Sequence, residues 1–368
     1  MVRLIGMRVI KAVAAAAVCV AALSACTGSQ RSSVTAPTVA SLLRPGGMPG
    51  FYLVVAGLEV VVRSSADGRV TGSVAIPVPA ATGRTSVGGQ AFGSADGRHF
   101  VIVVSRGGDL PGVADVTLFQ LTVSPDGRPG GLGQLAFDNQ GMPVIGAALS
   151  PDGRMLALSL VHEFPPGSLY GSVEVINLVS GKTRTWTGQS TPGYWPGVPA
   201  WGSDDTVVVP WWHSAVGMNP DRPPGMIPAV VTGIRQIDAA EPGGSLAATR
   251  LAAFPAPLPG LKSAVIAPGG GQLVASSCTA AGHTATARVV ELSAANGQLI
   301  RVLRTQTTRF GNDVDATGAV TLQCEVLSVA GDGAHVLVQA FTFGRIDNGV
   351  FTSLPGASPL VLPVSAAW

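Results

Sequence analysis

The chain has 368 residues, of which 46% are hydrophobic and 12% charged, with 48 glycines, 28 prolines and four cysteines. This composition excludes an intrinsically disordered chain, a long coiled coil and a disulfide-dense miniprotein. The formal net charge of +2 includes Arg3, Arg8 and Lys11, so the rest of the chain has a net charge of −1. A nearly neutral chain lacks the basic surface that binding to nucleic acid requires. The mean hydropathy of +0.40 raises the question of membrane insertion.

The N-terminus has the pattern of an export signal. Basic residues up to Lys11 precede the apolar run Ala12 to Ala25, which is shorter than the ~20 residues that span a bilayer. The run ends in Leu23-Ser24-Ala25-Cys26, which resembles the bacterial lipoprotein lipobox. The resemblance implies cleavage before Cys26, lipid attachment to its sulfur and an extracytoplasmic protein anchored to the cell membrane. Ordinary secretion with a coincidental cysteine is the alternative.

After the signal peptide, residues 1–25, the chain divides into a tether and one domain. Thr27–Ser33 is polar and rich in serine, as flexible tethers are, so residues 26–45 are predicted to be a tether. Residues 46–368 contain no run of 18 apolar residues free of Gly, Pro and charge, so the hydropathy comes from many short segments. These segments are rich in valine and bounded by turn residues, as β-strands are. Clear examples are Phe51–Ala56, Leu58–Val62, Phe100–Val104, Val173–Ile176, Val207–Val209 and Val336–Val338.

Two series of turns recur along this domain at intervals of fifty to sixty-five residues. The first is a Ser-x-Asp-Gly-like turn ahead of an apolar strand, found at Ser94–Arg98, Ser150–Arg154, Ser203–Asp205, Pro268–Gly271 and Asp332–Gly333. The second alternates with it, at Asp67-Gly68, Asp126-Gly127, Ser180-Gly181, Pro242–Gly244, Asn296-Gly297 and Pro355-Gly356. Asp-Gly and Asn-Gly supply the positive φ that tight hairpins require. Two hairpins per repeat predict four antiparallel strands per repeat.

Six such units fill the domain and predict an all-β fold, a β-propeller of six four-stranded blades. Radial packing buries the two faces of each sheet, which a single meander cannot do. A linear β array or two sandwiches would not predict two interleaved turn series at one period. Seven blades would result if Met218–Pro228 hid a degenerate unit. The first unit lacks one strand, which would come from Pro37–Leu43 or, closing the ring, from Leu360–Val364.

One repeat carries a family resemblance. Leu149–Ala157, with the sequence Leu-Ser-Pro-Asp-Gly-Arg-Met-Leu-Ala, resembles the repeat of TolB-type and WD-like bacterial propellers. Phe92–Arg98 and Trp201–Asp205 are weaker copies, and the Trp-Asp and Gly-His pairs of eukaryotic WD repeats are absent. The resemblance implies a propeller with a surface for binding partners and no particular chemistry, because function lies in sites rather than in folds.

The cysteines predict one disulfide in the folded domain. Cys19 lies in the signal peptide, and an acylated Cys26 leaves Cys278 and Cys324 in an oxidising compartment. These two are expected on strands of the fifth and sixth units, which could face each other across neighbouring blades. Two buried thiols are the alternative.

Motifs for catalysis, cofactors and metals are incomplete. His162-Glu163 begins a zinc-protease motif, but the position of its second histidine holds Pro166. Asp313–Gly318 begins like a calcium loop, but its twelfth position holds Cys324. Gly131–Ala136 fits a loose dinucleotide pattern but follows a hairpin instead of opening a helix. We therefore assign no catalytic residue, cofactor or metal site.

Aromatic residues are concentrated between residues 186 and 212. Trp201 precedes a turn of the first series and is expected in the core. Neighbouring residues on a strand point to opposite faces, so at most one of Trp211 and Trp212 is expected there too. The candidate ligand-binding residues, which would stack on a glycan or an apolar peptide, are Tyr194, Trp195, Trp211, Trp212 and His213. A loop packed on its own blade is the alternative.

The leading functional hypothesis is a non-catalytic binding or interaction module, a monomer whose partner is an envelope protein or glycan. The alternative is a hydrolase or lyase with a loop-built site at the propeller channel. Its candidate acids are Asp109, Asp115, Asp138, Glu163 and Asp221. A structural or assembly factor without a small ligand is a third hypothesis. Convergent polar groups at the channel would favour the enzyme.

Overall fold

The computed structural model describes most of the predicted domain, namely residues 48–77, 86–94, 96–107, 114–137, 142–164, 168–188, 193–203, 205–214, 229–258, 260–281, 284–309, 324–330, 333–355 and 365–368. All of these belong to one compact unit, Val39–Trp368. The signal peptide, Cys26 and the tether lie outside the described residues, so anchoring stays a prediction. Within the described ranges no helix is long and apolar enough to cross a membrane.

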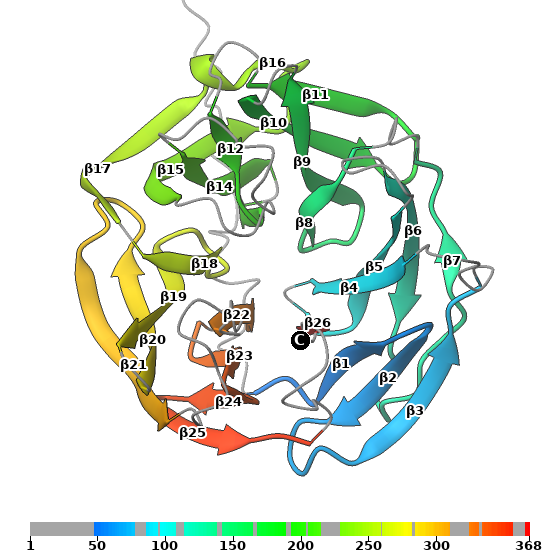
Figure 1. Ribbon diagram of the computed structural model, residues 1–368. Coiled ribbons are helices and arrows are strands. Elements are labelled where there is room, and N and C mark those ends of the chain that lie inside the picture. Colours follow the sequence, from blue (N-terminus) through cyan, green and yellow to red (C-terminus); the bar gives the residue numbers. More distant parts are fainter. Residues whose placement is uncertain are drawn as a thin grey trace, which may run out of the picture. The chain divides into compact units, whose positions relative to one another are not determined.

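The described residues form a β-propeller of six sheets in a ring, which confirms the predicted fold (Figure 1). Blade 1 contains β1 (Phe51–Ala56), β2 (Glu59–Ser64), β3 (Val70–Ala75) and β26 (Ser365–Ala367). Blade 2 contains β4 (Ser86–Gly93), β5 (His99–Gly107), β6 (Ala114–Thr122) and β7 (Gly133–Gln134). Blade 3 contains β8 (Val144–Leu149), β9 (Met155–Phe164), β10 (Ser168–Asn177) and β11 (Thr183–Thr187), with β16 (Gly244–Ser245) at its outer edge.

The second half of the ring repeats the arrangement. Blade 4 contains β13 (Ala200–Ser203), β14 (Thr206–His213), β15 (Val230–Asp238) and β17 (Arg250–Leu258), and β12 (Tyr194–Pro196) also pairs with β14. A 3₁₀ turn, η3 (Leu246–Ala248), precedes β17. Blade 5 contains β18 (Leu261–Ile266), β19 (Gln272–Ala281), β20 (Thr284–Ser293) and β21 (Leu299–Arg309). Blade 6 contains β22 (Cys324–Val329), β23 (His335–Ala340), β24 (Thr342–Asp347) and β25 (Val350–Ser353). Met218–Pro228, where a seventh unit was considered, lies outside the described residues.

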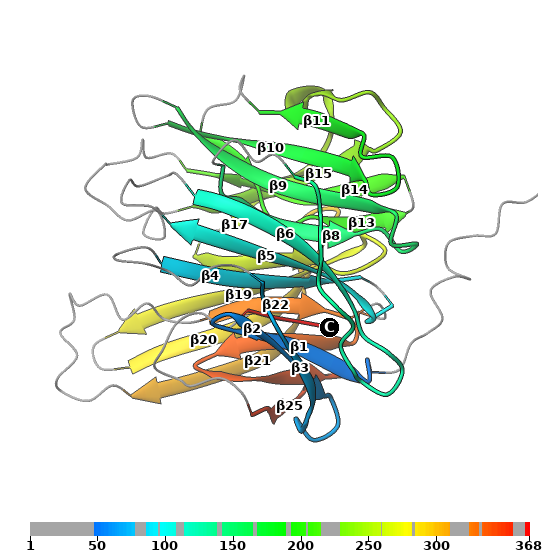
Figure 2. The ribbon, with the colours of Figure 1, turned by 90° about the vertical axis from the view of Figure 1, so that its right-hand side faces the viewer.

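The two predicted turn series lie at the same end of the blades, which we call the turn face. The first series joins the innermost strand of a blade to its second strand, and the second series joins the third strand to the fourth. In an antiparallel meander the first and third strands run in the same direction, so both end on the turn face (Figure 2). We call these connections the inner and outer turns. Positive φ at Gly97, Gly153, Gly68 and Gly127 explains the Asp-Gly pattern.

The sixth outer turn lies at Asn348-Gly349, so its assignment to Pro355-Gly356 is wrong. Asp347 pairs with Val350 across this turn, and φ is 49° at Asn348 and 87° at Gly349. Two residues of positive φ make the mirror-image turn that suits the twist of a hairpin. Both dipeptides fit the variable repeat interval, so the spacing alone could not choose between them. Pro355 instead follows β25, and its carbonyl accepts the Tyr52 hydroxyl at 3.1 Å.

The ring is closed by pairing the two ends of the domain. β26 lies antiparallel to β1, with Leu53 opposite Ala367 and Val55 opposite Ser365. This agrees with the expected closure by the C-terminal end of the domain, although the strand begins just after the predicted segment Leu360–Val364. That segment and the alternative, Pro37–Leu43, lie outside the described residues. Blade 1 therefore has no inner turn, because its innermost strand comes from the far end of the chain.

Serine side chains link the innermost strands of neighbouring blades. The Ser263 hydroxyl of β18 accepts the Val326 N–H of β22 at 2.7 Å. Ser328 of β22 accepts the Trp368 N–H, which follows β26, at 3.3 Å. Ser365 of β26 accepts the Ala91 N–H of β4 at 2.8 Å. Because the axial edge of an innermost strand has no ladder partner, these bonds satisfy donors that would otherwise be unpaired.

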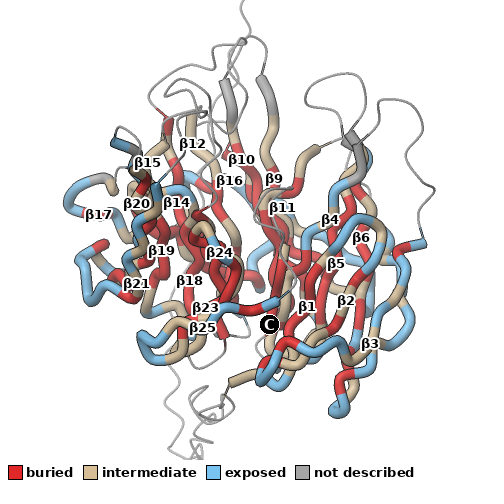
Figure 3. The backbone as a smooth tube through the Cα atoms, turned by 60° about the horizontal axis from the view of Figure 1, so that its bottom comes forward, coloured by how far each residue is buried: buried red, intermediate tan, exposed pale blue. Residues whose placement is uncertain are grey.

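Six hydrophobic clusters form the core, one between each pair of neighbouring blades. Both faces of each blade are therefore buried, and buried residues follow the middle of the strands while the turns are exposed (Figure 3). A sheet covered on both faces has almost continuous apolar strands. This arrangement explains the high hydropathy without any membrane span.

Candidate functional site

A cavity of about 350 Å³, the axial pocket, lies on the ring axis at the turn face. All six blades contribute the carboxyl ends of their innermost strands to it. Its lining includes Phe92–Gly93, Ala147–Leu149, Ala200–Gly202, Val265–Ile266, Leu327–Val329 and Ala367. Since five of these strands end in inner turns, residues of those turns, such as Pro151 and Asp152, stand at the pocket as well.

Small residues allow the innermost strands to approach one another around the pocket. A Cβ on Gly93 would overlap the Trp368 carbonyl oxygen, so only glycine fits beside the closing strand. A Cβ on Gly146 would lie 2.7 Å from the Val198 Cα, in the link between β12 and β13. The ring is therefore tight near the axis, and the pocket is the space left where these strands end.

The lining of the axial pocket is mainly aliphatic. Among the described lining residues, Asp152, Ser328 and Trp201 carry polar side-chain atoms. The Trp201 indole N–H already donates to the Ala148 carbonyl at 3.0 Å. The arrangement can therefore bind an apolar group and has few groups for proton transfer.

Asp152 is held in its turn as a carboxylate. Its Oδ1 accepts the Ser150 hydroxyl at 2.6 Å and the Arg154 N–H at 3.0 Å. Burial alone would raise the pKa of Asp152, but these hydrogen bonds outweigh it and lower the pKa. A general base works best with a pKa near the working pH, so Asp152 is suited to binding rather than to catalysis.

The two candidate acids within the described residues, Asp115 and Glu163, do not line this pocket. Asp109, Asp138 and Asp221 lie outside the described residues. Asp115 on β6 pairs in register with Arg106 on β5, at the end of blade 2 opposite the turn face. Glu163 is near the end of β9, also away from the turn face.

A serine–histidine pair that the sequence reasoning missed lies in blade 3. His162 Nε2 is 2.7 Å from Ser172 Oγ, and its ring stacks on Tyr170 with centroids 4.5 Å apart. Burial lowers the pKa of His162, so the imidazole is neutral at neutral pH. Ser172 is only 1% exposed and its neighbour Gly171 packs against Pro196. This pair therefore lies within blade 3, next to β12 of blade 4, and its hydroxyl is not open to a substrate.

Two of the five aromatic candidates lie in the core. Trp211 is 2% exposed between blades 3 and 4, and Trp212 is 8% exposed between blades 4 and 5. The expectation that at most one of them is buried is wrong, because a propeller blade is covered on both faces. Their rings are therefore not available to stack on a ligand. The Arg235 guanidinium already lies 4.5 Å from the Trp211 ring.

The other three aromatic candidates lie at the end of blade 4 opposite the turn face. Tyr194 is half-buried and stacked between Trp211 and His213, with centroids 5.9 and 4.1 Å away. Its ring is therefore already in contact with two aromatic neighbours. Trp195 and His213 are half-buried and remain as candidates for contact with a partner.

The predicted cysteine pair lies between blades 5 and 6. Cys278 on β19 and Cys324 on β22 are joined as a disulfide in the structure, with Cα atoms 6.1 Å apart. This separation lies within the range that a disulfide needs. The bridge would tie two neighbouring blades together.

Known proteins resemble this chain in fold and not in sequence. No protein-family model and no curated protein matches it. Solved structures that resemble it include the tricorn protease, at 9% identity and a TM-score of 0.42, over 83% of this chain and 34% of that one. Oligogalacturonate lyase in complex with manganese is 15% identical, with a TM-score of 0.40, over 78% and 70% of the two chains. The propeller domain of the trilobed protease from Pyrococcus furiosus is 7% identical, with a TM-score of 0.34, over 72% and 71%.

These neighbours are β-propeller proteins. A prolyl endopeptidase matches over 74% of this chain, at 16% identity and a TM-score of 0.37. The present chain spans about a third of the length of that protein and of the tricorn protease. Likenesses this distant carry no argument about what the present propeller binds or whether it catalyses a reaction.

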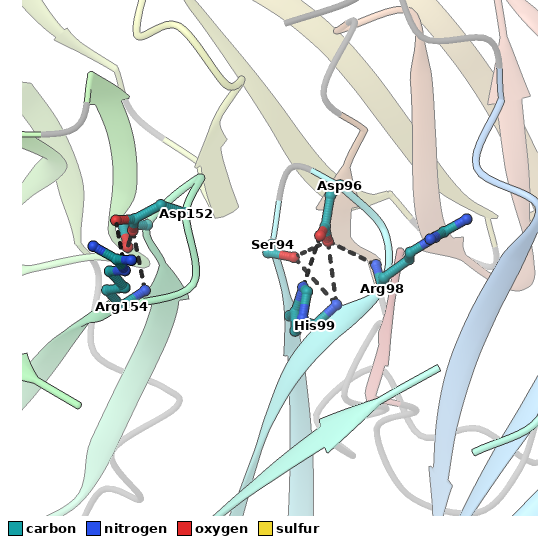
Figure 4. Close-up of polar contacts among 7 residues, drawn as sticks. Ser94, Asp96, Arg98, His99, Asp152 and Arg154 are labelled. Carbon is teal, nitrogen blue, oxygen red and sulfur yellow. Dashed lines mark hydrogen bonds and ion pairs between the residues drawn. The ribbon is translucent and has the colours of Figure 1, made fainter. Parts of the chain in front are cut away.

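In the outer turns of blades 1 and 2 and the inner turns of blades 2 and 3, an aspartate carboxylate accepts hydrogen bonds from its own turn. In the inner turn of blade 2, Asp96 accepts hydrogen bonds from the Ser94 hydroxyl, the Arg98 N–H and the His99 ring (Figure 4). Burial alone would raise the pKa of Asp96, and these bonds outweigh it, so the pKa is lowered. The Ser124 hydroxyl lowers the pKa of Asp126 in the same way.

These lowered pKa values predict acid sensitivity. A carboxyl group whose pKa is lower in the folded state than in the unfolded chain stabilises the fold. This stabilisation is fully present above the unfolded pKa of about 3.9 and is lost as the pH falls through the lower pKa of the folded state. We expect the unfolding free energy to decrease below about pH 5, and to decrease less steeply in an Asp96→Asn variant. Urea unfolding between pH 7 and pH 2.5 measures both slopes. Parallel curves for the two proteins would contradict the prediction.

Proposed function

We propose that this protein is a lipid-anchored, non-catalytic binding module of the cell envelope whose ligand enters the axial pocket. The observation that carries the proposal is the pocket itself, with its aliphatic lining from all six blades. Its volume of about 350 Å³ lies at the lower end of the range for small-molecule sites. Among the described lining residues, Asp152 and Ser328 supply few polar groups for catalysis, which favours binding over an enzyme at the channel.

The place where the described chain begins supports the same proposal. The chain joins the ring at the turn face, where Pro49 lies against Gly97 of an inner turn and the Gly50 carbonyl accepts the Ser65 N–H at 2.9 Å. The described part of the chain therefore begins on the same side of the ring as the pocket. The lipobox at Leu23–Cys26 would hold the protein at a membrane surface. An envelope protein or a glycan would meet Trp195 and His213 at the other end.

Filling the pocket tests the binding function. Val198 and Leu327 line the axial pocket and are half-buried, so Val198→Trp and Leu327→Trp place an indole in the cavity. The probe is N-phenyl-1-naphthylamine, a neutral apolar dye. A ligand that binds only the folded state raises the unfolding midpoint. We expect both variants to weaken the apparent affinity derived from this rise by roughly tenfold or more, about 1.4 kcal/mol.

The matched control is Val179→Trp, because Val179 is 80% exposed and does not line the pocket. It should respond to the dye as the unsubstituted protein does. Equal responses of all four proteins would refute binding in the axial pocket. Membrane fractionation of a Cys26→Ser variant, with Cys19→Ser as the control, tests the anchor separately.

A further inference from the structure

The polar atoms at the axial pocket suggest which ligands it accepts. We propose that the pocket takes an apolar ligand with a cationic head group, such as a primary ammonium, and that Asp152 at its mouth selects against anionic ligands. This inference rests on the proposed function of the pocket and adds the ligand class. The argument has three steps, which concern the ligand body, the charge at the mouth and the opposite wall.

The body of the ligand is apolar because the walls are. Val265 and Ile266 of blade 5, Leu327 and Val329 of blade 6, and Leu149 of blade 3 present branched aliphatic side chains. Removing apolar surface from water on such walls stabilises the complex in proportion to the area covered. The volume suits one short chain or ring and is too small for a folded segment.

The charge at the mouth is negative and incompletely paired. The inner turns of blades 2 and 3 have the same design, but the second carboxylate oxygen of the aspartate has a different partner in each turn (Figure 4). In blade 2 the second oxygen of Asp96 is 2.7 Å from the His99 ring. In blade 3 the corresponding oxygen, Asp152 Oδ2, lies 3.9 Å from Arg154 Nε.

Arg154 does not neutralise this carboxylate at the pocket. Its side chain is 74% exposed and is not part of the pocket lining, whereas Asp152 is. An ion pair this long and this exposed to water is weak and screened by salt. Among the described lining residues, the charged group is therefore the Asp152 carboxylate, which favours a cation and repels an anion.

The wall opposite Asp152 offers a second polar contact. Asp152 belongs to blade 3 and Ser328 to blade 6, which lie across the axis from each other in the ring (Figure 1). The Ser328 oxygen accepts the Trp368 N–H and keeps a second lone pair, while its own hydroxyl proton can be donated. An ammonium has three donors and no acceptor, so it matches the Asp152 carboxylate, and Ser328 offers a further polar contact on the opposite wall.

Three ligands with one tail and different heads test the inference. The probes are n-octylamine, n-octanol and n-octanoate, and the apparent affinity of each comes from the rise of the unfolding midpoint of the full chain at pH 7. We expect octylamine to bind at least tenfold more tightly than octanoate, with octanol between them. In Asp152→Asn the amide still accepts the hydrogen bonds of the turn, and the preference should shrink to threefold or less while octanol is unchanged.

The matched control is Asp126→Asn, in the outer turn of blade 2. Asp126 accepts the Ser124 hydroxyl as Asp152 accepts that of Ser150, but it does not line the pocket. This variant should keep the tenfold preference. Equal affinity for octylamine and octanoate, or a preference that persists in Asp152→Asn, would overturn the charge selection. Binding of the neutral dye in the same experiment would still support the proposed function. If the dye and all three probes failed to bind, both proposals would be overturned.

Discussion

Replacing Trp368 with alanine is expected to lower the free energy of unfolding by about 3–5 kcal/mol, the usual cost of deleting a large buried aromatic side chain. Trp368 is 2% exposed in the cluster between blades 6 and 1. Its ring meets Tyr52 edge-on, with centroids 6.3 Å apart. It follows β26, the strand that closes the ring, so the substitution weakens the packing between the first and last blades. Equilibrium unfolding in urea measures the change.

Val350→Ala is the control for this experiment. Val350 lies on the outermost strand of blade 6 and is 67% exposed, so its truncation should change stability by less than about 0.5 kcal/mol. A Trp368→Ala protein that unfolds at the urea concentration of the unsubstituted protein would show that closure does not depend on this side chain.

Removing the predicted disulfide is the second change with a large expected effect. A Cys278→Ala, Cys324→Ala double variant should lose roughly 3–4 kcal/mol, because the cross-link limits the unfolded chain over a loop of 46 residues. The bridge joins blades 5 and 6, and Cys324 is 1% exposed. Urea unfolding with and without reductant measures the effect, and the reduced unsubstituted protein should fall to the level of the double variant.

Cys19→Ala is the matched control, since Cys19 belongs to the predicted signal peptide. It should leave the unfolding curve unchanged. Titration in denaturant gives a direct check, since a disulfide adds two thiols on reduction. Equal thiol counts before and after reduction would contradict the bridge.

Features that depend on neighbouring residues were predictable from the sequence. The strand Phe51–Ala56 has the same bounds as β1. The inner turns at Ser94–Arg98 and Ser150–Arg154 join the strands that they were expected to join. A turn's conformation is set by a few adjacent residues, so its pattern can be read locally and its period along the chain counts the blades.

Features that depend on packing were predicted less well. Adjacent tryptophans on one strand suggested one buried and one exposed side chain, but blades on both sides bury Trp211 and Trp212 alike. The axial pocket was missed for a related reason. Its lining residues lie in or before five inner turns and on the closing strand β26, and only the ring brings these six parts of the chain together. The repeated position ahead of each inner turn is the signal that could have located them.

The sequence by itself indicated most of the strands and turns and favoured six blades, and it predicts the lipid anchor, because each of these is written in short or periodic patterns. Only the tertiary structure decided which residues meet at the axis. Asp152 and Ser328 are far apart in the chain, and they share one cavity because the ring places blades 3 and 6 opposite each other. That placement results from closure by β26 and from packing of every blade on both neighbours, which no local pattern encodes.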